Sequence, residues 1–429
     1  MKLLFINASM FSTNTDKYFV SWNMEPIVFG LIKKLTPSDI SIDFVDERYE
    51  KVKYSADYDA VVFSVRTYNA RNSYKISKRF RKLGVKTLAG GYHCALMPEE
   101  TVKHFDSVAL GSVEDCWPLM LRDLKENRLQ SLYSRTKKTG KMIRPDRKLF
   151  MKYPSLPMKV IETSRGCPHH CNYCCTSRLH NGRVLYKDLA VLEKEFMELR
   201  NHLVLFSDEN IASDKKRLRK ICKMTKKHNI KWLSQADIHI ADNEDFVHML
   251  ADSGCKGLLI GFESIDKATL KEYNKYINLN ADYKRTVDIL HKYGIMIYAA
   301  FILDTHEHDI LDATKDFIIK NKLDLCGLHP LTPFPGTNLY EEKLSTSPNV
   351  KEWWLRKFYP YFKFVFKDEH SEKMEKYINR TREKIFSLPG IFKRVDFKYF
   401  FNNPAMVFLS FIFNLAAITE VKGKSNINE

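Results

Sequence analysis

Short apolar runs alternate with amphipathic stretches along most of the chain, and this alternation limits the available folds more than any other feature. The amphipathic stretches place apolar residues at helical spacing, and Gly84, Gly254 and Gly294 stand where helices should end. Strands that alternate with helices predict parallel sheets covered by helices, which is an α/β fold. The predicted strands form two series, five in the first (3–7, 41–45, 59–65, 85–91 and 106–111) and six in the second (158–164, 203–207, 231–236, 257–262, 295–303 and 323–331).

The two series predict two domains. The first favours a doubly wound, Rossmann-like parallel sheet over residues 1–130, and the second favours a partial (β/α)6 barrel of the TIM type over residues 158–340. Residues 131–157 between them are basic and end in prolines, which indicates an exposed linker. Residues 341–429 form a small α-rich region, in which the apolar segment 404–418 is shorter than the roughly 20 residues of a membrane-spanning helix. We expect that segment to be either buried or interfacial.

The helical pattern predicts helices over 185–199 and 369–384, and the chain of 429 residues carries a formal net charge of +17. This charge favours anionic partners. Eight of the basic side chains lie in 215–227, on a predicted barrel helix, where a solvated outer face is the commoner role. Together with the segment 404–418, the charge favours peripheral contact with an acidic membrane surface over contact with nucleic acid. The opening residues MKLLFINASMFS lack the apolar length of a secretory signal, so we expect a cytoplasmic protein, with any membrane contact at the inner face.

The strongest chemical signal is Cys167-Pro-His-His-Cys171-Asn-Tyr-Cys174, directly after the first strand of the second series. Four of the nine cysteines lie within the nine residues 167–175, which chelation explains better than disulfides. Three thiolates on one short loop can hold three irons of a four-iron, four-sulfur cube and leave the fourth iron open to a ligand. On the residues alone a zinc knuckle remains an alternative, with one of three neighbours as its fourth ligand: Cys175, His169 or His170.

The segment ETSRGCPHHCNYC resembles the signature of the radical S-adenosylmethionine (SAM) enzymes, with Tyr173 as the aromatic residue before the last cysteine. LFSDENIASDKKRL, DSGCKGLLIGFES and HPLTPFPGTNLY are similar to further blocks of that family, in the same order. The resemblance implies a cluster on Cys167, Cys171 and Cys174, with SAM on the open iron and a deoxyadenosyl radical as the reactive species. No catalytic side chain is assigned beyond these ligands. For Glu263, an ion pair on the barrel rim is an equal alternative to SAM binding. The candidate SAM contacts are Tyr173, Glu263, Gln235, Ser207 and Asp208.

The amino-terminal part resembles the cobalamin-binding domain that precedes many radical SAM enzymes, through SVRTYNA, AGGYHCALMPEE and ALGSVEDCWPLML. Glycines at strand ends allow a flat macrocycle or its nucleotide tail to approach the backbone closely. The Asp-x-His-x-x-Gly segment that supplies a histidine to cobalt in other cobalamin proteins does not follow the first strand. His93 is a candidate neighbour of the cobalamin, although a lone histidine in a turn is more often a capping or surface residue. The candidate cobalamin contacts are Ser64, Thr67, Gly90, Gly91 and Gly111.

Within the family, the chain is similar to hopanoid methylases and to lipid and bacteriochlorophyll cyclases. The resemblance implies a 4Fe-4S cluster, SAM and cobalamin, an electron donor such as flavodoxin or ferredoxin, and methylation of an unactivated carbon of a hydrophobic or lipid-like small molecule. Alternatives are radical cyclisation or carbon–carbon coupling without methyl transfer, and a non-catalytic corrinoid or iron–sulfur sensor. A transfer-RNA methylthiotransferase needs three further cluster cysteines, and the first domain offers only Cys94 and Cys116. Asp304 stands where relatives usually carry a glycine, so we expect the loop geometry at this position to differ from that of the family.

Overall fold

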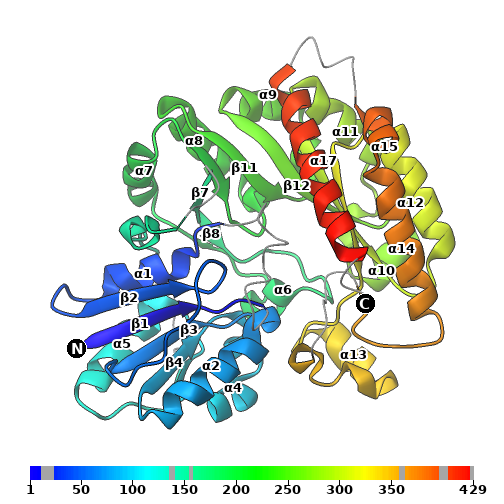
Figure 1. Ribbon diagram of the computed structural model, residues 1–429. Coiled ribbons are helices and arrows are strands. Elements are labelled where there is room, and N and C mark those ends of the chain that lie inside the picture. The colour runs from blue at the N-terminus through cyan, green and yellow to red at the C-terminus, as the bar shows by residue number, and fades with distance from the viewer. Residues whose placement is uncertain (11–23, 135–140, 154–157, 357–362, 396–403, 426–429) are drawn as a thin grey trace.

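The computed structural model describes residues 1–10, 24–134, 141–153, 158–356, 363–395 and 404–425. Two six-stranded parallel sheets follow one another along the chain and lie side by side, each with its own helices (Figure 1). The predicted α/β fold, with a doubly wound sheet followed by a partial barrel, is confirmed. Parts of the predicted linker and of the carboxyl-terminal region, including most of the aromatic run 358–366, lie outside the described residues.

All five strands predicted for the first series are present in the first sheet, together with a sixth that the sequence did not indicate. The strands are β1 (Lys2–Asn7), β2 (Ser41–Asp46), β3 (Ala60–Ser64), β4 (Lys86–Gly90), β5 (Ser107–Ala109) and β6 (Leu132–Tyr133). Their order is β2-β1-β3-β4-β5-β6, so the chain winds outward from β1 first in one direction and then in the other. The connecting helices are α1 (Ile27–Leu35), α2 (Ala70–Lys82), α3 (Tyr92–Leu96), α4 (Pro98–His104) and α5 (Val113–Lys125).

Part of the predicted linker belongs to the first domain, which corrects the prediction that this stretch is exposed. The strand β6 pairs with β5, and the 3-10 helix η3 (Arg147–Phe150) buries Leu149 and Phe150. The Phe150 ring lies 5.8 Å from the ring of Phe44 on β2. The basic composition obscured this packing because the cations beside the apolar pair are themselves neutralised, as in the contact of 2.8 Å between Arg147 and Glu195.

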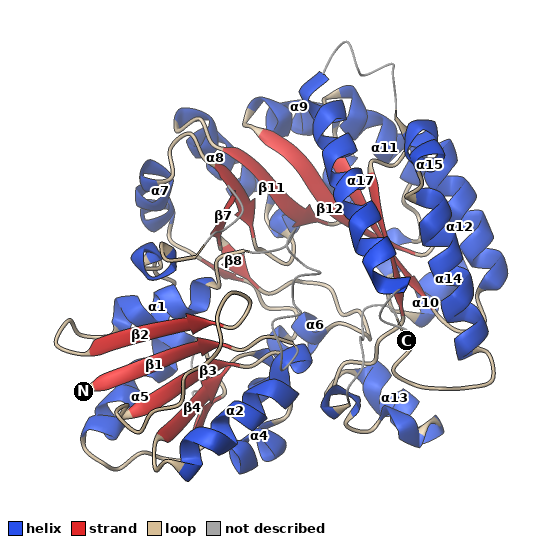
Figure 2. Ribbon diagram, viewed as in Figure 1, coloured by secondary structure: helices blue, strands red, loops and turns tan. Residues whose placement is uncertain are grey.

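The second sheet contains the six strands predicted for it. They are β7 (Met158–Ile161), β10 (Leu203–Phe206), β11 (Lys231–Ala236), β12 (Cys255–Glu263), β13 (Met296–Leu303) and β14 (Leu325–Pro330). Their order is sequential, from β7 at one edge to β14 at the other, as in an incomplete barrel (Figure 2). Alternate side chains of β13 are fully buried against helices, which leaves the other set to face the barrel interior. The helices of this series are α7 (Leu189–Glu198), α8 (Lys215–Lys227), α9 (Glu244–Asp252), α10 (Lys267–Glu272), α11 (Tyr283–Lys292) and α12 (His308–Lys320).

The helix predicted over 185–199 begins later than its apolar spacing indicates. Leu185 lies in a two-residue strand, β9 (Leu185–Tyr186), which pairs antiparallel with β8 (Ser164–Arg165). The helix starts at Leu189 because the Asp188 carboxylate accepts a hydrogen bond of 2.7 Å from the Ala190 N–H and caps its first turn. Leu185 matched the helical spacing without belonging to the helix.

The carboxyl-terminal region is helical, with α13 (Asn338–Thr346), α14 (Ser371–Ile385), α15 (Leu388–Arg394) and α17 (Pro404–Ser425). One side of α17 packs on the second sheet, where the buried Asn414 donates a hydrogen bond of 2.7 Å to the Asp324 carbonyl just before β14. The other side exposes Phe408 and Ile412. The segment 404–418 is therefore buried on one side and exposed on the other. Among the described helices, none has the length and apolarity that a bilayer crossing requires.

Candidate active site

The three cysteines of the signature lie on one loop between β8 and the short helix α6 (Cys175–His180), at the carboxyl end of β7. Cys171 is buried, and Cys167 and Cys174 are half-buried. Gly166 enters the loop with φ +100°, and a Cβ atom there would lie 2.1 Å from a backbone carbonyl oxygen, so only glycine fits. Within the described ranges, no three His, Cys, Asp or Glu side chains lie close enough together to hold a single metal ion. An iron–sulfur cube places one thiolate on each iron, so its ligands need not converge on one point.

Burial controls the protonation of these thiols. Burial raises the pKa of Cys167 to about 11 and also raises the pKa of Cys171 above its usual value. A thiolate is the form that binds a metal, so binding of iron to this loop must displace protons. Cys175, the next residue after the signature, is on α6, and burial raises the pKa of its thiol to about 12.

Glu263 ends β12 close to the cysteine loop. Its φ of +62° lies in the left-handed region, which is unfavourable for a residue with a Cβ, and the pairing of β12 with β13 shifts register at the same point. The Glu263 Oε1 atom lies 3.0 Å from the Lys275 ammonium, and both side chains are nearly buried. A Cβ on Gly261 would lie 2.1 Å from Glu263 Oε1, so this glycine makes room for the pair. The ion pair considered as the alternative for Glu263 is therefore present.

Lys275 is a site residue that the sequence did not reveal. Burial lowers its pKa, but Glu263 and the thiols of Cys171 and Cys167 raise the pKa by more, so the ammonium stays charged. Tyr173, the aromatic residue of the signature, belongs to the same cluster: burial and then Glu263 raise the pKa of its hydroxyl. The structure thus brings a fixed cation, a carboxylate and a tyrosine to the cysteine loop. A fixed cation beside three thiolates can stabilise the negative charge of a cluster or bind a carboxylate ligand.

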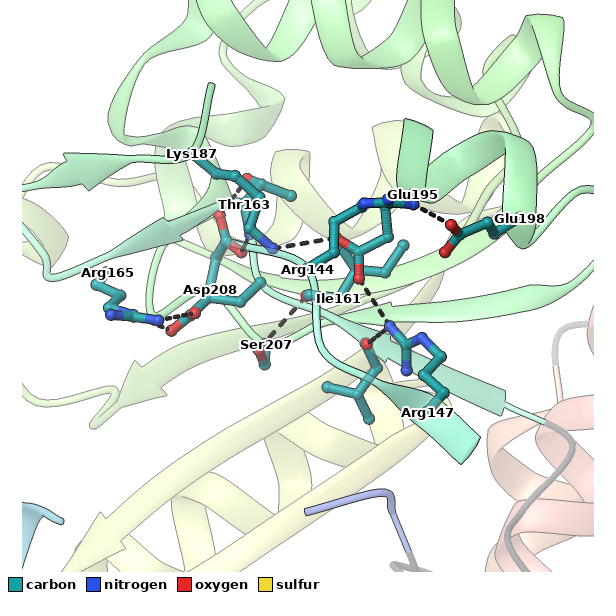
Figure 3. A network of polar contacts seen from close by, with 12 residues as sticks. Arg144, Arg147, Ile161, Thr163, Arg165, Lys187, Glu195, Glu198, Ser207 and Asp208 are labelled. Atoms are coloured by element: carbon teal, nitrogen blue, oxygen red, sulfur yellow. Dashed lines mark hydrogen bonds and ion pairs between the residues drawn. The ribbon is translucent and has the colours of Figure 1, made fainter. Parts of the chain in front are cut away.

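Of two other candidate SAM contacts, Asp208 faces the protein interior and Ser207 is half-buried (Figure 3). Asp208 is fully buried and accepts hydrogen bonds of 2.7 Å and 2.5 Å from the N–H and hydroxyl of Thr163, and one of 2.6 Å from the Ser164 hydroxyl. Burial raises the pKa of Asp208 to about 6. The Ser207 hydroxyl lies 3.4 Å from the carbonyl of Ile161. These residues hold the chain that leads into the cysteine loop. Gln235 is exposed on β11.

A cavity of about 430 Å³ adjoins the cysteine loop. His169 on its wall lies 3.5 Å from Asp237, which follows β11 and also accepts a hydrogen bond of 2.8 Å from Asn210. The loop is thereby tied to the ends of two neighbouring strands. The cavity is lined by Pro168, His169, His170, Cys171, Asn274, Tyr276 and Ile277.

The candidate cobalamin contacts lie at or just beyond the carboxyl ends of β3, β4 and β5. Gly91 and Gly111 are exposed there, and Ser64 and Gly90 are half-buried, so a flat group has access to this edge. Gly91 has φ +111°, and a Cβ there would lie 2.6 Å from the Val65 carbonyl oxygen, so the turn itself requires glycine. Thr67 faces inward, since its buried hydroxyl lies 3.3 Å from a ring nitrogen of His93.

His93 is fully buried, which corrects the expectation of a capping or surface residue. One ring nitrogen lies 3.1 Å from the hydroxyl of Tyr74 and 3.4 Å from the carboxylate of Glu100. Glu100 also accepts a hydrogen bond of 2.9 Å from the indole of Trp354. His93 therefore belongs to a polar cluster that joins the first domain to the carboxyl-terminal region. Glu100 is seven residues away, but Tyr74 and Trp354 are too distant in sequence for the pattern around His93 to indicate this cluster.

Asp304 directly follows β13 and stands at the position where relatives were expected to carry a glycine. Its carboxylate lies 3.0 Å from the ammonium of Lys343 on α13, and its backbone N–H donates a hydrogen bond of 2.6 Å to Glu307. Burial raises the pKa of Glu307 to about 7. The loop after β13 is thus fixed by side-chain contacts.

Comparison with known proteins finds similar sequences. Residues 161–318 match the radical SAM superfamily. Over 360 residues, which cover 77% of this chain and 79% of the relative, the sequence is 29% identical to a bacteriochlorophyllide d C-8(2)-methyltransferase from Chlorobaculum tepidum.

Two solved structures share the fold. The radical SAM methyltransferase TsrM from Kitasatospora setae, with tryptophan and a SAM analogue bound, has a TM-score of 0.60 and 13% identity, over 81% of this chain and 77% of that one. The cobalamin-dependent SAM radical enzyme OxsB, with aqua-cobalamin bound, has a TM-score of 0.58 and 14% identity, over 89% of this chain and 61% of that one. At these identities the likeness concerns the fold alone.

Proposed function

Because residues 161–318 of this chain are a radical SAM domain, we propose that the protein methylates an unactivated carbon of a hydrophobic small molecule with SAM and a 4Fe-4S cluster. The observation that carries the proposal is the placing of the signature cysteines, the Glu263–Lys275 pair and Tyr173 around one loop at the carboxyl ends of the barrel strands. Active sites of barrels of this kind lie at that end.

The proposed ligands of the cluster are Cys167, Cys171 and Cys174. When bound, the reduced cluster supplies the electron that cleaves SAM, and cobalamin supplies the methyl group that the substrate receives. The proposed role of the side chains around the loop is to bind SAM and to orient it. Lys275 offers three N–H donors and a positive charge to a carboxylate, and Glu263 accepts hydrogen bonds from an amino or ribose group. The ring of Tyr173 lies 5.9 Å from the ring of Tyr273, which holds this part of the loop in place.

Cobalamin is proposed as the second cofactor, supported by the fold shared with OxsB and by the accessible edge at Ser64, Gly90, Gly91 and Gly111. These positions fit a flat macrocycle because three of them lack a side chain. Thr67 is less suited, since its hydroxyl faces His93. The bacteriochlorophyllide methyltransferase among the relatives supports a large apolar ring system as the substrate class.

The test is anaerobic reconstitution with iron, sulfide and hydroxocobalamin, followed by dithionite, methyl-labelled SAM and bacteriochlorophyllide d. We expect about four irons per chain, one bound corrinoid, deoxyadenosine, and a pigment product that carries the label. Cleavage of SAM by a protein that binds no corrinoid would contradict methylation through cobalamin. A new product without the label would favour radical cyclisation or coupling instead. Reduction in cells requires a donor, for which we propose a flavodoxin or ferredoxin that docks near the cavity beside Cys171.

We also propose peripheral contact with an acidic bilayer through α15 and α17. Phe392 and Phe408 are 55% and 64% exposed, and the ring of Phe392 lies 5.9 Å from Phe411, so the two helices share one apolar surface. Residues 371–425 carry ten Lys or Arg against five Asp or Glu, and two of these cations, Arg382 and Arg394, are buried. Apolar side chains near cations bind acidic bilayers both by burying apolar area and by electrostatic attraction to anionic lipids.

Sedimentation with phosphatidylglycerol vesicles tests this contact. The intact chain should sediment with them but not with phosphatidylcholine vesicles, because the cations need an acidic surface. The Phe392→Ser/Phe408→Ser variant should bind about tenfold more weakly. Equal binding of the variant and the intact chain would contradict the proposal.

A further inference from the structure

Two polar contacts connect the first domain to the residues just before Cys167. In the first, Arg165 on β8 donates hydrogen bonds of 2.8 Å and 2.9 Å to the two carboxylate oxygens of Glu114, near the start of α5. The same guanidinium donates two hydrogen bonds of 2.7 Å to Glu162 in its own domain. All three side chains are at most 18% exposed. Forked pairs of this kind fix both distance and orientation.

The second contact passes through Glu209, which follows β10. One carboxylate oxygen accepts a hydrogen bond of 2.7 Å from the hydroxyl of Tyr92, the first residue of α3. The other accepts a hydrogen bond of 3.0 Å from the N–H of Gly166. Tyr92 directly follows Gly90 and Gly91, so a single carboxylate links the glycine turn of the first sheet to the residue that precedes Cys167.

We propose that these two contacts form a clamp, made of Tyr92, Glu209, Glu114 and Arg165, that holds the cysteine loop at a fixed position against the first domain. Both contacts end on consecutive residues, 165 and 166, immediately before a proposed cluster ligand. On the other side they begin at the carboxyl ends of β4 and β5, where the candidate cobalamin contacts lie. The role of the clamp in methyl transfer rests on the proposed function, and these residues act as positioning residues.

The domains have a second connection, remote from the cysteine loop, so the clamp can be broken without separating them. Glu25 of the first domain lies 2.8 Å from the ammonium of Lys159 on β7, and it also contacts the guanidinium of Arg147. Arg147 in turn pairs with Glu195 on α7. Glu25 and Glu195 are buried, so this connection is shielded from water.

The Tyr92→Phe/Glu114→Ala variant tests the clamp. It removes both contacts with the first domain but leaves Glu209 bonded to Gly166, and Arg165 paired with Glu162. The matched control is Tyr58→Phe/Glu50→Ala, which removes a hydroxyl contact to Asp43 and the carboxylate contacts to Lys152 and Tyr153, all away from the loop.

Hydrogen exchange gives a readout that needs no cofactor. In the clamp variant, amides of residues 164–175 should exchange at least about tenfold faster than in the intact chain, while the control and the strands of both sheets stay unchanged. In the reconstituted enzyme, deoxyadenosine formation should stay within about twofold, but labelled product per deoxyadenosine should fall about tenfold, because a small misplacement of reacting groups is costly.

Unchanged exchange in the loop, or an equal change in the control, would overturn the clamp. An unchanged ratio of product to deoxyadenosine would overturn its role in methyl transfer. If the intact enzyme forms neither deoxyadenosine nor labelled product, the proposed function fails, and the exchange experiment still decides whether the clamp exists.

Discussion

Replacement of Cys171 by alanine is expected to abolish both the iron–sulfur cluster and the cleavage of SAM. Cys171 is the most deeply buried of the three signature cysteines, and the cavity beside it is lined by the same loop. A cube that loses one of three protein ligands has two irons without thiolates, and an exposed cluster of that kind decomposes. Iron content and visible absorbance after anaerobic reconstitution should fall to background, and no deoxyadenosine should form.

Cys175→Ala is the matched control, since this cysteine is adjacent to the signature on α6. We expect it to bind the full complement of iron and to cleave SAM at a rate similar to that of the intact chain. A zinc site in which Cys175 is the fourth ligand gives the opposite result: the replacement would weaken metal binding as much as Cys171→Ala does. Retention of the cluster by the Cys171→Ala variant would exclude Cys171 as a ligand.

Replacement of Glu195 by alanine is expected to give a large loss of stability, of about 3–5 kcal/mol in the free energy of unfolding. The Glu195 carboxylate lies 2.8 Å from the guanidinium of Arg147 and 3.1 Å from the ammonium of Lys187 (Figure 3). The Lys187 and Glu195 side chains are 2% and 1% exposed. Removal of the carboxylate leaves a buried ammonium without this counter-charge, and that desolvation cost is the source of the effect.

Glu198→Ala is the control for this prediction. Glu198 is on the same helix and contacts the guanidinium of Arg144, but its side chain is 55% exposed (Figure 3). Solvent screens such a pair, so its loss should cost no more than about 1 kcal/mol. Urea denaturation of both variants, followed by circular dichroism, measures the difference. Equal destabilisation by the two replacements would contradict the importance of burial.

The strands could be predicted because each is a short apolar run bounded by polar residues or glycine. All eleven predicted strands have counterparts in the structure, and Gly254 and Gly294 end helices with φ values of +100° and +69°. The cysteine loop could be located because its three candidate ligands are close in sequence. These features depend on local pattern, which the sequence contains directly.

The features that could not be predicted depend on contacts between distant residues. Lys275 lies twelve residues after Glu263 in an unremarkable polar loop, and only the fold brings it to the cysteines. His93 lies in a cluster with Trp354, which follows it by more than two hundred residues. Asp208 has the sequence position of a ligand contact, yet its carboxylate faces inward because neighbouring hydroxyls satisfy it. Local pattern places a residue at a strand end, but tertiary packing determines its partners.

The carboxyl ends of the two parallel sheets face each other across the clamp, and this arrangement has an electrostatic consequence. In a parallel sheet each helix starts near the end of the preceding strand, so α2, α5 and α8 all direct their first turns toward the region between the domains. The peptide dipoles of each helix add up to partial positive charge at that end. Carboxylates of the chain already lie at two of these ends, with Glu114 and Asp115 in the first turn of α5 and Asp214 as the cap of α8. The helix dipole therefore favours the position of Glu114 in the clamp, and this contribution should weaken as ionic strength rises.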